Sequence, residues 1–146
     1  MMKIKNPLTK EYIITSKYGY RVIQGKRGFH FGIDIVGEEH TTCDVKNCFH
    51  GTAKVLRSYL SSSGGNTIVI EHYFENRRYV ALYCHLRKRY VKEGDIVYEN
   101  QNIGYMGNTG HSFGAHLHFQ LAELSSKQSV IVSFDKLGNL NPQDYL

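Results

Sequence analysis

Two histidines one residue apart, His116 and His118, mark the part of the chain best suited to chemistry. From position 115 to position 122, Ala, Leu, Phe and Leu alternate with His, His, Gln and Ala. This period is typical of a β-strand, so both imidazoles are expected on one face. Neighbouring imidazoles can share a metal ion, or one can bind it while the other transfers protons. An ordinary polar strand face is the alternative, and further ligands elsewhere would decide between the two.

A second candidate pair, His30 and Asp34, lies in the segment from Phe29 to Val36. Gly32 and the β-branched residues after it disfavour a helix, and in a strand the two side chains share a face with Gly32 between them. We expect Gly32 to leave room for an ion between them. His30, Asp34 and His118 would supply two nitrogens and one oxygen. Three protein ligands leave one position of a tetrahedral metal open, as is typical of a catalytic centre.

The segment from Tyr79 to Leu86 supplies a further candidate, His85. Alternation places Tyr83 and His85 on one strand face and Cys84 on the other, so Tyr83 and His85 are expected to reach a common pocket. Cys84 is expected to be buried and inert on the core side. A nucleophilic pair of Cys84 and His85 is disfavoured, because neighbours in a strand point to opposite faces.

The remaining pattern predicts an all-β domain, a mostly antiparallel β-sheet with little helix. Short alternating runs predict strands over 67–72, 79–86, 95–98, 115–122 and 130–134, and a short turn over 125–129. One domain is expected over residues 1–146, with its core from about residue 6 onward. A substrate groove over one face of the sheet would be walled by the loops 24–28, 61–66 and 123–129. His111, in a glycine-rich loop, is expected to be exposed rather than part of that groove.

The 146 residues carry a formal net charge of +5, with basic clusters at 26–27, 77–78 and 87–89. Positive charge favours polyanionic partners, although solvated strand faces explain each cluster equally well. No recognisable nucleic-acid-binding module occurs, so no nucleic-acid partner is expected. Of the three cysteines, Cys43 and Cys48 could close a small loop in an oxidising environment.

Three ordered motifs make the chain resemble the lysostaphin-type zinc endopeptidases of bacterial peptidoglycan. They are His-x-x-x-Asp at 30–34, Tyr-x-His-Leu at 83–86 and His-Leu-His-Phe at 116–119. The stretches 14–21, 51–55, 103–110 and 141–146 match as well, so the resemblance covers nearly the whole chain from about Asn6. It implies the all-β fold of that family and one zinc ion per chain.

The resemblance also implies a role for each candidate residue. His30, Asp34 and His118 correspond to the zinc ligands, and His116 corresponds to the residue that activates water. His85 corresponds to the histidine that orients water or stabilises the oxyanion. The implied reaction is zinc-dependent hydrolysis of a peptide bond in peptidoglycan, in the stem peptide or the cross-bridge.

Two other functions stay open. A catalytically inactive module that binds the cell wall or activates a partner hydrolase would carry no zinc. A cysteine hydrolase would use Cys43, Cys48 or Cys84 as its nucleophile. The chain departs from the family at Gln120, where many relatives carry an acidic residue. Because Gln120 lies past the ligands, we expect no effect on catalysis.

The expected partners are bacterial peptidoglycan and anionic wall polymers, and the protein is expected to be a monomer. Residues 1–7 lack the apolar core of a secretory signal, and no transmembrane run occurs. The inferred substrate nevertheless lies in the cell wall, in the extracellular or periplasmic space. A phage lysin, released through a membrane lesion or carried on a virion, would reach it without a leader. The alternative is a native leader missing from the sequence.

Overall fold

The computed structural model describes residues 1–129 and 134–146 and confirms the all-β prediction. Its described helical elements are three short 3₁₀ helices, η1 (Glu38–His40), η2 (Phe134–Lys136) and η3 (Pro142–Asp144). The strands are β1 (Tyr12–Ser16), β2 (Gly19–Ile23), β3 (Lys26–His30), β4 (Ile33–Gly37), β5 (Asp44–Lys46), β6 (Ala53–Ser61), β7 (Gly65–Phe74), β8 (Arg77–Arg89), β9 (Ile96–Val97), β10 (Asn102–Met106), β11 (Leu117–Leu124) and β12 (Gly138–Leu140).

Four of the five predicted strands correspond to observed ones: β7, β8, β9 and β11. The fifth, over 130–134, falls largely outside the described residues, and its last residue, Phe134, begins η2. The predicted turn over 125–129 is present, with Gln128 N donating to the Ser125 carbonyl oxygen. Among the described residues, none of the helices has the length and apolar character needed to cross a membrane.

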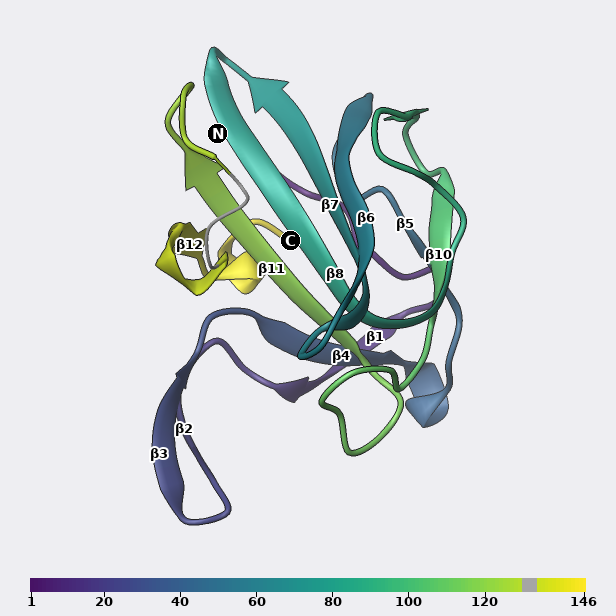
Figure 1. Ribbon diagram of the computed structural model, residues 1–146, viewed down its shortest axis with the longest axis vertical. Helices are drawn as coiled ribbons and strands as arrows, with labels where there is room; N and C mark the ends of the chain where they lie inside the picture. Colours follow the sequence, from purple (N-terminus) through teal and green to yellow (C-terminus); the bar gives the residue numbers. More distant parts are fainter. Residues whose placement is uncertain (130–133) are drawn as a thin grey trace.

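One large antiparallel sheet forms the body of the molecule, in the order β1-β4-β11-β8-β7-β6-β9. β10 joins it through β8 and carries β5, and β12 pairs with β11. β2 and β3 form a separate hairpin that stands out from this body, at the lower left of Figure 1. The loop between β10 and β11 lies at the same lower end of the molecule (Figure 1).

The central strands are buried on both faces, which explains their nearly continuous apolar sequence. On one face, Ala81 and Tyr83 of β8 pack into the main core beside Phe119. On the other face, Val80 and Leu82 belong to a second apolar cluster. β11 lies between β4 and β8, so any side chain at the end of β11 is held by two neighbouring strands.

The predicted single strand over 29–36 is wrong in one respect, because the chain bends at Phe31 and Gly32 between β3 and β4. β4 then pairs with β11, with Ile33 opposite Phe119. Gly32 is buried, and a Cβ atom added there would collide with the carbonyl oxygen of Phe119. The glycine therefore makes room for the backbone of β11, and not for an ion as expected.

This packing predicts that Gly32→Ala destabilises the protein by about 1–3 kcal/mol, because the added methyl group forces backbone movement. Gly28→Ala is the matched control, since Gly28 lies in β3 with nothing within 4 Å of an added Cβ. Urea unfolding of both variants measures the difference. Equal stability of the two variants would show that β4 and β11 are not in close contact at Gly32.

Both arginines of the basic cluster at 77–78 form ion pairs. Arg77 Nε lies 3.0 Å from Glu123 Oε2, and Arg78 Nε lies 2.5 Å from Glu71 Oε2. Arg78 also donates to the carbonyl oxygens of Ser125 and Gln128, which fixes the turn after β11. The charge at 77–78 is therefore balanced within the protein and supports its structure.

Candidate active site

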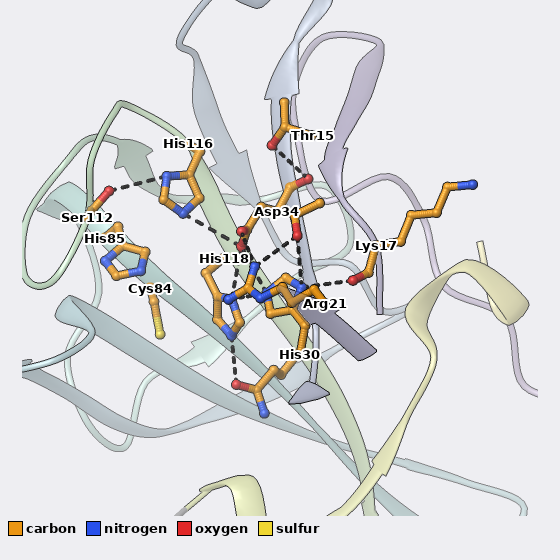
Figure 2. Close-up of polar contacts among 12 residues, drawn as sticks. Thr15, Lys17, Arg21, His30, Asp34, Cys84, His85, Ser112, His116 and His118 are labelled. Atoms are coloured by element: carbon orange, nitrogen blue, oxygen red, sulfur yellow. Dashed lines mark hydrogen bonds and ion pairs between the residues drawn. The ribbon is translucent and has the colours of Figure 1, made fainter. Parts of the chain in front are cut away.

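His30, Asp34 and His118 meet where β3, β4 and β11 come together (Figure 2). His118 pairs directly with Asp34 across the sheet, and the bend after β3 brings in His30. Asp34 Oδ1 lies 3.3 Å from His30 Nε2 and 3.0 Å from His118 Nδ1, and these nitrogens are 3.1 Å apart. Ligand atoms around a tetrahedral zinc ion with bonds of about 2.1 Å are about 3.4 Å apart. The three donor atoms therefore fit a zinc ion in both type and spacing.

Hydrogen bonds set the orientation of the first histidine in this cluster. His30 Nδ1 lies 2.9 Å from the carbonyl oxygen of Lys17. A carbonyl oxygen only accepts, so Nδ1 carries the hydrogen and Nε2 presents its lone pair to the other two residues. This arrangement is the usual support for a metal-binding histidine.

His118 is held in the opposite tautomer by a chain of amides. The side-chain nitrogen of Asn139 donates to the carbonyl oxygens of Phe134 and Leu137, so the Asn139 oxygen accepts from Gln120 Nε2 at 3.1 Å. The Gln120 oxygen therefore faces His118 Nε2 at 2.7 Å and accepts its hydrogen. This leaves the Nδ1 lone pair of His118 directed at Asp34.

Gln120 is therefore part of the site, and the expectation that it merely lies past the ligands is wrong. It is buried and shares a strand face with His118, two residues away. The alternation that places His116 and His118 on one face also places Gln120 there. That signal was available in the sequence, but the contact with Asn139 was not.

Asp34 is held on its other side by Arg21, which sequence reasoning did not single out. Arg21 Nη1 lies 3.4 Å from Asp34 Oδ2 (Figure 2) and donates to Ser16 Oγ at 2.8 Å. Burial alone would raise the pKa of Asp34, but hydrogen bonds with His118 and His30 outweigh it and hold this pKa well below its usual value. The carboxylate is therefore ionised and available as a ligand.

His116 lies beside the cluster, with Nε2 3.6 Å from Asp34 Oδ1. Its Nδ1 lies 3.3 Å from Ser112 Oγ (Figure 2) and 2.7 Å from the carbonyl oxygen of Gly114. Because the carbonyl accepts the Nδ1 hydrogen, Nε2 is a proton acceptor turned toward the site. The sequence prediction that His116 and His118 share a face is confirmed.

His85 completes the group, with its ring centroid 4.9 Å from that of His116. Its Nδ1 donates to the carbonyl oxygen of Thr109 at 2.7 Å, which leaves the Nε2 lone pair unprotonated. Burial lowers the pKa of His85, despite that hydrogen bond. Neutral imidazole is therefore the favoured form at this position.

Tyr83 does not reach the site with His85, so that prediction is wrong. Tyr83 is fully buried in the main core, where its hydroxyl donates to the Lys46 carbonyl at 2.8 Å and accepts from Cys48 N at 3.0 Å. The register of β8 against β7 shifts here, and His85 has a φ of 64°. This irregularity in β8 breaks the regular alternation and turns His85 toward His116.

All three cysteines are free and buried, so no bridge joins Cys43 to Cys48. Cys84 is buried as predicted, but it belongs to the second apolar cluster and not to the main core. Burial raises the pKa of Cys48 and of Cys84 to about 12. Neither thiol is ionised at neutral pH, which disfavours a cysteine nucleophile.

Two cavities of about 570 Å³ and 720 Å³ adjoin the cluster. His85, His111 and His118 line both. The predicted loop 61–66 contributes to the first cavity and Gln24 of the loop 24–28 to the second, whereas the described lining includes no residue of 123–129. His111 is exposed as expected, but it also lines the groove.

Comparison with known proteins identifies the family of this chain. The profile of peptidase family M23 matches residues 28–130, which include all five candidate residues. The chain is 37% identical over 70 residues to the peptidoglycan DD-endopeptidase ShyC of Vibrio cholerae. The matched stretch is 48% of this chain but only 16% of that protein. The chain therefore spans a small part of this curated relative.

Solved structures agree with the sequence match. The catalytic domain of the antimicrobial peptidase lysostaphin from Staphylococcus simulans superimposes with a TM-score of 0.70 and 30% identity, covering 92% of this chain and 91% of that one. A zinc-containing peptidase from Vibrio cholerae gives a TM-score of 0.68 and 32% identity, over 83% of this chain and 37% of that one. The extent of the family match, together with this shared fold, shows that the chain belongs to peptidase family M23.

Proposed function

We propose that this chain is a zinc-dependent endopeptidase that hydrolyses peptide bonds of bacterial peptidoglycan. The observation that carries the proposal is the convergence of His30, Asp34 and His118 from separate parts of the chain, with the acceptor nitrogen of His116 beside them. A relative named as a peptidoglycan endopeptidase and a structural neighbour named as a zinc-containing peptidase support the substrate and the metal.

In this proposal His30 Nε2, Asp34 Oδ1 and His118 Nδ1 hold the zinc ion. When bound, the ion polarises the scissile carbonyl and lowers the pKa of water at the site. His116 Nε2 accepts the proton of the attacking water and returns it to the leaving amine. Thr109 and Gly114 keep the two catalytic histidines in the tautomer that presents Nε2 to the substrate.

Of the two roles considered for His85, the geometry favours the positioning of water. Stabilising an oxyanion requires an N–H donor, but the single N–H of the neutral His85 ring already donates to the carbonyl oxygen of Thr109. The lowered pKa of His85 disfavours a second proton on the ring. His85 Nε2 would instead accept a hydrogen bond from the attacking water.

The proposed place of action is the bacterial cell wall or periplasm, where the substrate lies, and the 146 residues are proposed to form one peptidase domain. The phage origin, the monomeric state and the binding of anionic wall polymers stay predictions. Digestion of purified cell walls, followed by mass spectrometry of the fragments, tests the function. We expect new amino termini that appear with zinc, vanish with a chelator and return when zinc is restored. A folded protein that binds walls, contains no zinc and releases no fragment would instead be the inactive module.

The amide chain behind His118 yields a further prediction. Gln120→Leu is expected to lower zinc affinity roughly 10–100-fold, because His118 loses the partner that fixes its tautomer. Gln120→Glu is the matched variant, since its carboxylate can accept the hydrogen of His118 although it cannot donate to Asn139, and it is expected to keep most of the zinc affinity. Competition with a chromogenic chelator measures both. Unchanged affinity of Gln120→Leu would mean that His118 is held adequately by β4 and β8 alone.

A further inference from the structure

We propose that Arg57 binds a carboxylate of the substrate and thereby selects peptides that carry a free acid near the cleaved bond. This inference rests on the proposed function and concerns the cavity of about 570 Å³ beside the site. Arg57 lines that cavity together with Tyr59 of β6, and His85 and His118 line the same space. A ligand held by Arg57 would therefore lie in the cavity that contains the reacting centre.

A bulge in β6 places Arg57 in the cavity. Val55 pairs with Ile70 on the main-core face, but the register then shifts and Arg57 pairs with Val69, which belongs to the second cluster on the opposite face. Without the bulge, strict alternation would place Arg57 on the core face with Val55. The bulge therefore keeps the charged Arg57 side chain out of the apolar core and places it in the lining of the groove.

Arg57 is ordered by stacking and has unused hydrogen-bond donors. Its guanidinium carbon lies 3.8 Å from the centroid of the Tyr59 ring, a cation–π contact that leaves the edge of the guanidinium accessible. Within residues 1–129 and 134–146, the Arg57 side chain has no hydrogen bond or ion pair. A preoriented planar donor without a protein acceptor matches the geometry of a carboxylate.

Among the described residues, two other charged side chains apart from the proposed ligand set line the cavity. Arg21 is already engaged with Asp34 and Ser16, so it has less capacity for a ligand. Asp135 is exposed and makes no ion pair with Arg57 in the described structure. It would compete with an incoming carboxylate for Arg57, which makes it a useful position to vary.

These features favour acidic stem peptides over neutral, glycine-rich bridges as substrate. A carboxylate can take two parallel hydrogen bonds from Arg57, whereas a carboxamide at the same position is neutral and offers only one acceptor atom. We expect the preference for the acid over the carboxamide to arise from binding, in the substrate complex and in the transition state alike. Arg57 is not placed to exchange protons with the reacting atoms.

Two synthetic cross-linked stem peptides test the proposal, identical except that the acid next to the cleaved bond is a carboxamide in one. The wild-type kcat/KM is expected to be roughly ten- to hundredfold higher for the acid. Arg57→Gln should lower kcat/KM for the acid to about the level of the carboxamide, with a much smaller loss for the carboxamide, and Arg57→Lys should keep part of the preference. Asp135→Asn should keep or increase the preference. Arg77→Gln, which removes a remote arginine, is the control.

Calorimetric binding of both peptides to His116→Ala, alone and combined with Arg57→Gln, tests the contact without hydrolysis. Tighter binding of the acid that disappears with Arg57→Gln supports the proposal, even if the wild type cleaves neither peptide and the proposed function fails. Equal treatment of both peptides by the wild type overturns the assignment of Arg57 while hydrolysis stands. The assignment of Arg57 is also overturned if Arg57→Gln lowers kcat/KM equally for both peptides. It is overturned as well if a polyphosphate polymer inhibits the enzyme through Arg57 while the enzyme shows no preference between the peptides.

Discussion

Replacing His118 by alanine is expected to abolish both zinc binding and hydrolysis. His118 contacts both other members of the cluster, with Nδ1 3.1 Å from His30 Nε2 and 3.0 Å from Asp34 Oδ1. Two remaining ligands hold zinc poorly, so the loss in affinity should exceed the roughly 10–100-fold typical of removing an outer hydrogen-bond partner. Zinc content after dialysis and the rate of fragment release from cell walls measure the two effects.

His50→Ala is the matched control, because His50 is an exposed histidine that lines neither cavity. It is expected to keep zinc and activity. The folded state of His118→Ala must be checked by circular dichroism, since β11 lies between β4 and β8. A folded His118→Ala protein that retains a full equivalent of zinc would disprove the proposed ligand set.

His116→Ala is expected to separate metal binding from turnover. The variant should retain its zinc, because His30, Asp34 and His118 remain, but hydrolysis should slow by roughly 10²–10⁴-fold, the usual contribution of a general base. The reason is geometric: Nε2 of His116 is an unprotonated acceptor that lies 3.6 Å from Asp34 Oδ1 and does not belong to the ligand set. Zinc content and initial rates on the same preparation check both halves of the prediction.

Two other results for His116→Ala would change the role assigned to His116. Loss of zinc in His116→Ala would make His116 a fourth ligand and close the position that the mechanism needs open. A wild-type rate in a zinc-loaded His116→Ala protein would leave the metal site intact and move the general base elsewhere. His85, whose Nε2 is also unprotonated, would then be the next residue to test.

Wherever a strand is regular, the sequence was sufficient to predict which side chains share a face. β11 begins at Leu117, directly after His116, and the extended backbone continues the alternation across this point, so the common face of His116 and His118 followed from the period of two. The strands β7, β8, β9 and β11 also followed, because apolar alternation and intervening turns are local properties. The three motifs together further indicated the family to which the chain belongs.

The tertiary structure decided what depends on irregular backbone and on contacts between distant residues. A single extra residue in a strand exchanges its two faces, and a local sequence pattern does not reveal where it occurs. This is why His85 leaves the face of Tyr83 and why Arg57 lines the groove. Likewise, Gly32 is required by the approach of β11, a strand almost ninety positions away. The tautomer of His118 depends on Asn139 through Gln120. A local sequence pattern could not predict this, because Asn139 is a hydrogen-bond partner from another strand.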